Sequence, residues 1–289
     1  MKIQSHVKEV APRLLANWEA LTRRAHQPRV QKTEFEAVRT FWIGPRLPDF
    51  HSMCLRSWLA LGYRVELFSY APVENLPNGV FVRDAAEVMP RSWLFDDAPS
   101  LDKKPATRAN IFRLAMLAKD LGPWSDADYL MLRPLPKARD ILIGRESNGL
   151  ICNAILWVPP DFEMLERIVR SFRARDTPPW SISTTYKMKL SQAFGGREMP
   201  HLAYPKHHWG RSAIYYFIMK YNLYDQVQPY QRFYWPLMYD DRLYRSETPF
   251  EEIVDNPEVC GVHFFYAKDH AFQAADDDSF IGWAKKKFL

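Results

Sequence analysis

The spacing of apolar side chains predicts a strand, a helix and a second strand in direct succession. Residues 37–43 are mostly apolar and precede a Gly-Pro pair, which is typical of a strand that ends in a turn. Residues 51–61 carry apolar side chains at helical spacing, and residues 63–69 predict the next strand. Two strands joined through a helix form a βαβ unit, so we expect a parallel sheet.

The pattern continues in the same way toward the C-terminus. An apolar stripe predicts a helix over residues 108–121, and residues 124–132 predict one strand that Asp126 and Asp128 interrupt. The remaining predicted elements are strands over residues 80–82, 150–158 and 259–265 and a helix over residues 161–172. This alternation indicates an α/β fold, with helices packed on a sheet.

The first 35 residues form a separate predicted unit. They hold seven Lys or Arg and three Glu, so they carry +4 of the chain's net charge of +5. Apolar residues at helical spacing predict a basic amphipathic helix over residues 7–25, followed by a polar linker, and we expect residues 36–289 to form a single domain. Such a helix could contact anionic lipid, nucleic acid or an acidic partner, or present a solvated face.

The composition excludes several classes of protein. With 289 residues, of which 47% are hydrophobic and 25% charged, the chain suits a folded protein with a large core rather than a disordered or fibrous one. No run reaches the roughly 18 apolar residues that span a bilayer, and the first residues lack the apolar centre of a secretory signal. Three widely spaced cysteines predict neither a disulfide framework nor a zinc knuckle, which favours a reducing compartment.

Two carboxylates in an apolar context are the strongest chemical signal. Asp126 and Asp128 follow a predicted helix and turn, and an apolar run comes directly after them. In an extended strand they would point to the same face, about 7 Å apart, whereas the alternative is a solvated turn. Two oxygen ligands on one side suit Mg²⁺ or Mn²⁺ and leave positions open for a diphosphate.

Basic side chains lie in and before the helix predicted around Arg113. Arg113 is on or beside the apolar stripe of that helix, and a buried arginine requires an anionic partner. We therefore expect Arg113 to pair with Asp126 or to contact a phosphate or sugar, unless it extends along an edge to water. Lys103, Lys104 and Arg108 are further candidates for phosphate contact, or part of a solvated loop.

Short blocks of residues stand in a particular order around the Asp-X-Asp pair. The nearest are Asn110, Arg113, Gly122, Trp124, Asp126 and Asp128, followed by Arg133-Pro134-Leu135. The others are Phe41-Trp42-Ile43-Gly44, Asn153-Ala154, Trp209-Gly210, Phe233-Tyr234-Trp235-Pro236 and Val262-His263-Phe264. Together they resemble the glycosyltransferases with a DXD sugar-binding motif, a group that includes capsular polysaccharide transferases, α-1,6-mannosyltransferases and α-1,4-galactosyltransferases.

The resemblance implies a GT-A-type fold, which is a Rossmann-like mixed sheet with flanking helices, and the activity of a metal-dependent retaining glycosyltransferase. The donor would be a UDP- or GDP-sugar, and the metal Mn²⁺ or Mg²⁺. The acceptor would be a glycan, a lipid-linked sugar or another hydroxyl compound. Because transferases of lipid-linked glycans work at the membrane, the expected location is the cytoplasm, with peripheral contact at the inner membrane face.

The resemblance also assigns roles to individual residues. Asp126, Asp128 and Arg113 would be catalytic, and His263 would complete a metal site with the two aspartates. The residues that would contact the nucleotide-sugar are Trp42, Ile43, Asn110 and Asn153. For His263 and for the aromatic and amide side chains among these, a plain structural role in the core or in a turn is the alternative.

Departures from the family pattern leave a second interpretation open. Asn110 stands where the family has an acidic residue, Pro123 where it has a second glycine, and Arg211-Ser212 where it has Gly-Pro. The chain could thus be a catalytically weak carbohydrate- or nucleic-acid-binding protein on a transferase fold. The aromatic residues over 204–244 could stack on sugars or on single-stranded bases, or pack in the core. A Mg²⁺-dependent phosphohydrolase that uses the two aspartates is a third interpretation.

Overall fold

The computed structural model describes residues 34–95, 105–147, 149–174, 178, 180, 208–234, 241–246, 250–264 and 269–289. The helix predicted over residues 7–25, and Lys103 and Lys104, lie outside the described residues. The division of the chain after residue 35 therefore stays a prediction.

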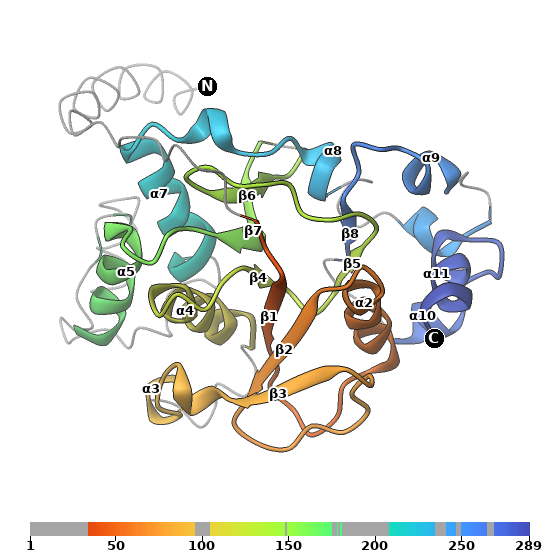
Figure 1. The fold of residues 1–289 in the computed structure, drawn as a ribbon, viewed down its shortest axis with the longest axis horizontal. Coiled ribbons are helices and arrows are strands. Elements are labelled where there is room, and N and C mark those ends of the chain that lie inside the picture. Colours follow the sequence, from red (N-terminus) through yellow and green to blue (C-terminus); the bar gives the residue numbers. More distant parts are fainter. Residues whose placement is uncertain are drawn as a thin grey trace, which may run out of the picture.

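A mixed sheet occupies the centre of the molecule. Within the described residues it has six strands in the order β3-β2-β1-β4-β7-β6 (Figure 1). The strands are β1 (Ala37–Phe41), β2 (Arg64–Ser69), β3 (Val80–Asp84), β4 (Trp124–Ser125), β6 (Leu142–Arg145) and β7 (Ile151–Trp157). The strands from β3 to β4 run parallel, and β7 is antiparallel to both β4 and β6. The predicted Rossmann-like mixed sheet of a GT-A-type α/β fold is confirmed.

The predicted βαβ unit near the start of the described chain is also confirmed. β1 and β2 pair in parallel, and helix α2 (Asp49–Ala60) connects them. Phe50, Cys54 and Trp58 recur at helical spacing and are buried, which explains why this segment forms a helix that packs by one face. Gly62 follows with φ +83°, a left-handed conformation that glycine adopts readily and that turns the chain into β2.

Helices cover both sides of the sheet, as Figure 1 shows. On one side lie α4 (Pro105–Ala118), α5 (Glu163–Ala174) and α7 (Ala213–Lys220), and on the other α2, α10 (Asp269–Gln273) and α11 (Phe280–Phe288). The shorter helical segments are η1 (Ala85–Glu87), α3 (Ser92–Phe95), η4 (His208–Ser212), η5 (Tyr224–Gln226), α8 (Tyr230–Phe233), η6 (Asp241–Tyr244) and α9 (Glu251–Val254). No helix in the described part of the chain has the length and apolar character needed to cross a membrane.

The single strand predicted over residues 124–132 is wrong. The Asp126 N–H still bonds to the carbonyl of Ala154 on β7, and the chain then turns away from the central sheet, where the Tyr129 N–H bonds back to the carbonyl of Asp126. The next strand, β5 (Tyr129–Met131), pairs with β8 (Gly261–His263) in a separate antiparallel ladder. The two aspartates therefore lie in a turn between two sheets.

Aromatic residues from the stretch over 204–244 pack inside the molecule. Trp209, Phe233 and Tyr234 are buried in the core. His208 is buried as well, and burial lowers the pKa of its imidazole to about 4, so that it is neutral at pH 7. For these side chains the core-packing alternative holds.

A buried carboxylate ties the three parallel strands β1, β2 and β3 together. Glu66 on β2 accepts from Arg39 of β1 at 2.8 Å and from Arg83 of β3 at 3.1 Å, and Arg64 lies 2.7 Å from its other oxygen. Burial opposes ionisation of Glu66, but the hydrogen bonds and charges of the arginines outweigh it and lower the pKa of this carboxyl. The ion pairs thus join neighbouring strands side by side.

Replacing Glu66 with Gln is expected to lower the free energy of unfolding at pH 7 by about 3 kcal/mol, because it leaves the largely buried Arg39 without its anion. The lowered pKa means that this contribution is complete above the unfolded-state pKa of about 4.3 and disappears as the pH falls through the folded-state value. Urea unfolding of both proteins across pH 3–8 measures it. A difference that does not shrink below pH 4 would contradict the assignment.

Candidate metal and donor site

Asp126, Asp128 and His263 converge at the end of β4. His263 Nε2 lies 3.2 Å from Oδ1 of Asp128 and 3.7 Å from Oδ2 of Asp126. One ligand atom from each residue can be chosen so that all three lie within 4.8 Å of one another. This is closer than the 7 Å expected for two aspartates on one strand, because the turn between β4 and β5 folds the carboxylates toward each other.

Strand pairing brings His263 to the aspartates from the far end of the chain. In the ladder between β5 and β8, Tyr129 stands opposite His263, and the Phe264 N–H bonds to the carbonyl of Asp128. The side chains of Asp126 and Asp128 remain 23% and 21% exposed, so the group is accessible from solvent. The predicted aspartates and histidine are thus brought together at one edge of the sheet.

The donor set of this group fits a divalent metal ion. Two carboxylate oxygens and a neutral imidazole suit Mn²⁺, and also Mg²⁺ when oxygen ligands from a substrate or water fill the remaining positions. Three protein ligands on one side do not enclose an ion. Asp126, Asp128 and His263 could therefore hold a metal and leave room for a second molecule to coordinate it.

The charges within the group are strongly linked. Burial would lower the pKa of His263, but the Asp128 carboxylate raises it well above its usual value. Burial likewise opposes ionisation of Asp128, yet His263 outweighs it and lowers the pKa of that carboxyl. Burial raises the pKa of Asp126, an effect that the Arg113 charge reduces. A metal ion would replace the proton on His263 as the partner of the two carboxylates.

Arg113 is buried and paired, as predicted. Its guanidinium lies 3.0 Å from Oδ1 of Asp126, and it also donates to the backbone carbonyls of Ala109 and Asn153. Arg113 is 3% exposed, so water does not replace these partners. Of the roles considered for Arg113, pairing with Asp126 is the one that the structure displays.

A pair of amides lies beside Arg113. The Asn153 amide nitrogen donates to Oδ1 of Asn110 at 3.0 Å, which joins β7 to α4. Gly210 packs against both amides so closely that a Cβ there would lie 2.5 Å from the Asn110 side chain and 2.8 Å from that of Asn153. The Asn110, Asn153 and Trp209-Gly210 blocks, far apart in the sequence, therefore meet at one place.

Trp42 and Ile43 follow β1 directly and are half-buried. The Trp42 indole N–H donates to the Arg46 carbonyl, and its ring lies 4.8 Å from that of His51, in the first turn of α2. The charge of His51 contributes to the lowered pKa of Asp128, so His51 belongs to the same electrostatic neighbourhood. His51 was not among the residues predicted for the site, although its place at the start of the helix after β1 points to this edge.

Arg108 is not in a solvated loop. It is 1% exposed, its Nε donates to the Leu94 carbonyl at 3.0 Å, and its guanidinium lies 4.2 Å from the ring centre of Phe95. Arg108 lies in α4, which begins at Pro105, earlier than predicted. These contacts place Arg108 in the packing of α3 against α4, so the solvated-loop interpretation is wrong for this residue.

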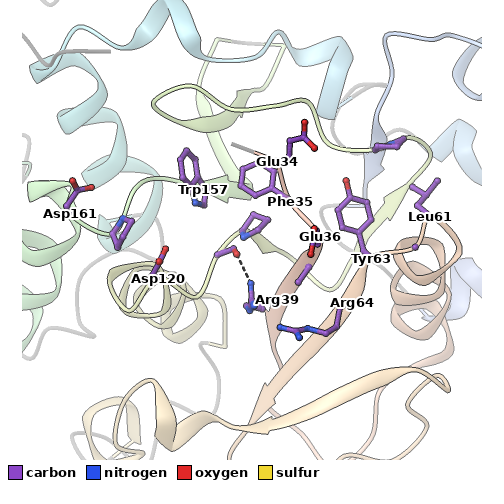
Figure 2. Close-up of a pocket in the computed structure, with 16 residues that line it drawn as sticks. Glu34, Phe35, Glu36, Arg39, Leu61, Tyr63, Arg64, Asp120, Trp157 and Asp161 are labelled. Carbon is purple, nitrogen blue, oxygen red and sulfur yellow. Dashed lines mark hydrogen bonds between the residues drawn. The ribbon is translucent and has the colours of Figure 1, made fainter. Parts of the chain in front are cut away.

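A large cleft of about 1140 Å³ lies at the opposite edge of the sheet, where β1 and β2 begin. Figure 2 shows Phe35, Tyr63 and Trp157 around it, with Asp120 nearby and Arg39 bonded to the Gly122 carbonyl. None of the predicted site residues lines this cleft. α/β sheets usually bind ligands at the carboxyl ends of their parallel strands, whereas this cleft lies at the amino ends of β1 and β2.

The chain shows only limited similarity to known proteins. No protein-family model matches the chain, and no curated protein matches it. Among solved structures, the chain is similar to one described as "PaToxG Glycosyltransferase", with a TM-score of 0.38 and 12% sequence identity. The alignment covers 78% of this chain and 90% of that one.

Replacing Arg113 with Leu is expected to lower the free energy of unfolding by about 3–5 kcal/mol, because the change leaves the largely buried Asp126 carboxylate without its cation. Arg113→Lys should lower the free energy of unfolding by less, since a single ammonium keeps the charge but cannot reach all three acceptors. Urea unfolding at pH 7 measures both. A Leu variant that unfolds at the wild-type midpoint would show that the pair is dispensable.

Proposed function

We propose that this chain is a metal-dependent retaining glycosyltransferase that moves a sugar from a UDP- or GDP-sugar to a hydroxyl acceptor. The observation that carries the proposal is the Asp126–Asp128–His263 group at the carboxyl end of β4, in a GT-A-type sheet. The order of sequence blocks that resemble DXD-motif transferases supports it. We propose Mn²⁺ as the preferred ion because one of the three ligands is an imidazole.

In this proposal the three side chains would hold the ion, and the diphosphate of the donor could occupy the positions that they leave open. A divalent ion there would neutralise the charge that builds on the diphosphate as it leaves. Asp126, held by Arg113, would orient the ion toward the donor together with Asp128 and His263. The chain's task at this point is to keep the ligand atoms close together against their mutual repulsion.

The remaining predicted residues would bind the organic part of the donor. Trp42 would stack on the nucleobase with Ile43 beside it. The side-chain nitrogen of Asn153 is engaged with Asn110. The side-chain carbonyl oxygen of Asn153 is therefore the atom that would accept a hydrogen bond from a sugar hydroxyl. The Gly210 contact would keep that amide pair in place.

We propose that the new bond forms on the face of the sugar from which the diphosphate leaves. The anomeric carbon loses its bond to the phosphate oxygen and gains one to the acceptor oxygen, and the proton of the acceptor hydroxyl passes to the leaving phosphate. The protein then contributes by holding donor and acceptor in the reacting geometry. A glycan or lipid-linked sugar would be the acceptor, and the +4 charge of residues 1–35 would favour peripheral contact with anionic lipid on the cytoplasmic side.

The proposal predicts Mn²⁺-dependent release of UDP or GDP from a nucleotide-sugar, even without an acceptor, through slow hydrolysis. Asp128→Asn should reduce this release by about 100-fold or more, because it removes a metal ligand and its charge. The measurement is nucleoside diphosphate formed across a panel of UDP- and GDP-sugars, with Mn²⁺ and with EDTA. Retention of Mn²⁺-dependent release in the Asn variant would refute the metal role of Asp128.

Asp120→Asn is the matched control. Asp120 lines the large cleft and has φ 58°, a conformation that asparagine tolerates, so this change should leave release intact. Loss of release in this variant alone would move the donor site to the cleft. Binding of nucleotide-sugars without release of diphosphate from any donor would favour the carbohydrate-binding interpretation instead.

A further inference from the structure

The two oxygens of the Asp126 carboxylate have different surroundings. Oδ1 accepts from the indole Nε1–H of Trp124 at 2.7 Å and lies 3.0 Å from the Arg113 guanidinium. Oδ2 faces the other way and lies 3.7 Å from His263 Nε2. One oxygen is thus held by a hydrogen bond and an ion pair, and the other points into the candidate metal group.

The backbone places Trp124 for this contact. β4 is extended, and the Asp126 N–H continues its pairing by bonding to the Ala154 carbonyl at 2.7 Å. Side chains two apart in an extended segment lie on the same face, so the indole edge and the carboxylate meet directly. Trp124 is 1% exposed, and water therefore cannot substitute for its N–H.

Arg113 reinforces the arrangement from above the indole ring. Its guanidinium carbon lies 4.7 Å from the ring centre of Trp124, a cation–π distance, while its Nη1 reaches the same Oδ1. The ring supports the arginine, and one carboxylate oxygen thus receives a hydrogen bond from the indole and an ion pair from the guanidinium. Rotation of the Asp126 carboxylate would break the hydrogen bond from Trp124 and the ion pair with Arg113 at once.

We propose that Trp124 is a positioning residue for the metal, through its hydrogen bond to Asp126. Together with Arg113 it holds Oδ1 away from the ion, so that Asp126 coordinates through Oδ2 alone. A ligand that uses one oxygen leaves one more coordination position for the diphosphate. The inference rests on the proposed function, because it assigns Trp124 a task at the same metal site.

The test compares two Trp→Phe variants that each lose one buried indole hydrogen bond. Trp124→Phe removes the donor to Asp126. Trp58→Phe removes the indole N–H that donates to the backbone carbonyl of Tyr129 at 3.2 Å. Trp58 is 0% exposed, and its replacement leaves the contacts of Asp126 untouched. The readout is the Mn²⁺ dissociation constant of the protein without donor, measured by titration calorimetry or electron paramagnetic resonance, together with the melting temperature.

Trp124→Phe is expected to weaken Mn²⁺ binding by about 10-fold, the usual effect of removing a group that orients a metal ligand. Trp58→Phe should bind Mn²⁺ within about twofold of the wild-type protein while melting lower to a similar extent. Equal Mn²⁺ affinity in wild type and Trp124→Phe overturns the inference. An equal loss in both variants overturns it too, since the effect would then be general softening of the core.

Two further outcomes are distinguishable. If Trp124→Phe does not fold, Trp124→Tyr is measured in the same way, because its hydroxyl projects from the ring axis and not from the position of the indole N–H. The same 10-fold loss is expected, and unchanged affinity overturns the inference. If the wild-type protein itself binds no Mn²⁺, the proposed metal site fails and the role of Trp124 fails with it.

Discussion

The ion pair between Asp126 and Arg113 is the interaction on which the candidate site depends. A carboxylate at the end of a buried strand needs a cation, and Arg113 supplies it from a helix whose remaining surface is largely buried. The same guanidinium bonds to the backbone of Asn153 and supports the Trp124 ring. One partly buried charge pair thus connects α4, β4 and β7 at the point where the chain turns toward Asp128.

The two edges of the sheet have different character. At the carboxyl edge, the chain leaves the sheet after β4, and the short ladder of β5 and β8 brings His263 back to the two aspartates. At the amino edge lies a cleft of about 1140 Å³, which none of these residues lines. The Arg39–Glu66–Arg83 ion pairs cross the parallel strands between these edges and give the sheet a fixed frame. The cleft therefore lies at one edge of the sheet, and the converging ligand atoms lie at the other.

Much of the fold could be predicted because it depends on local periodicity. The βαβ unit and the helix around Arg113 follow from apolar spacing, and the burial of Arg113 follows from its place on an apolar stripe. The course of the chain through Asp126 and Asp128 could not be predicted in the same way. An apolar run on either side is compatible with one long strand, and only the turn closed by the Tyr129 N–H on the Asp126 carbonyl and the pairing with β8 divide it into β4 and β5.

The sequence by itself determined the fold class, the two carboxylates and the types of residue that accompany them. These properties reside in single residues and their near neighbours. Only the tertiary structure decided that Arg113 pairs with Asp126, that Trp124 shares the same oxygen, and that His51 lies near Asp128. It also decided that Arg108 belongs to the core. Contacts of this kind join distant segments or depend on which way a side chain turns, and the energy that selects them arises only when the packed elements exclude water.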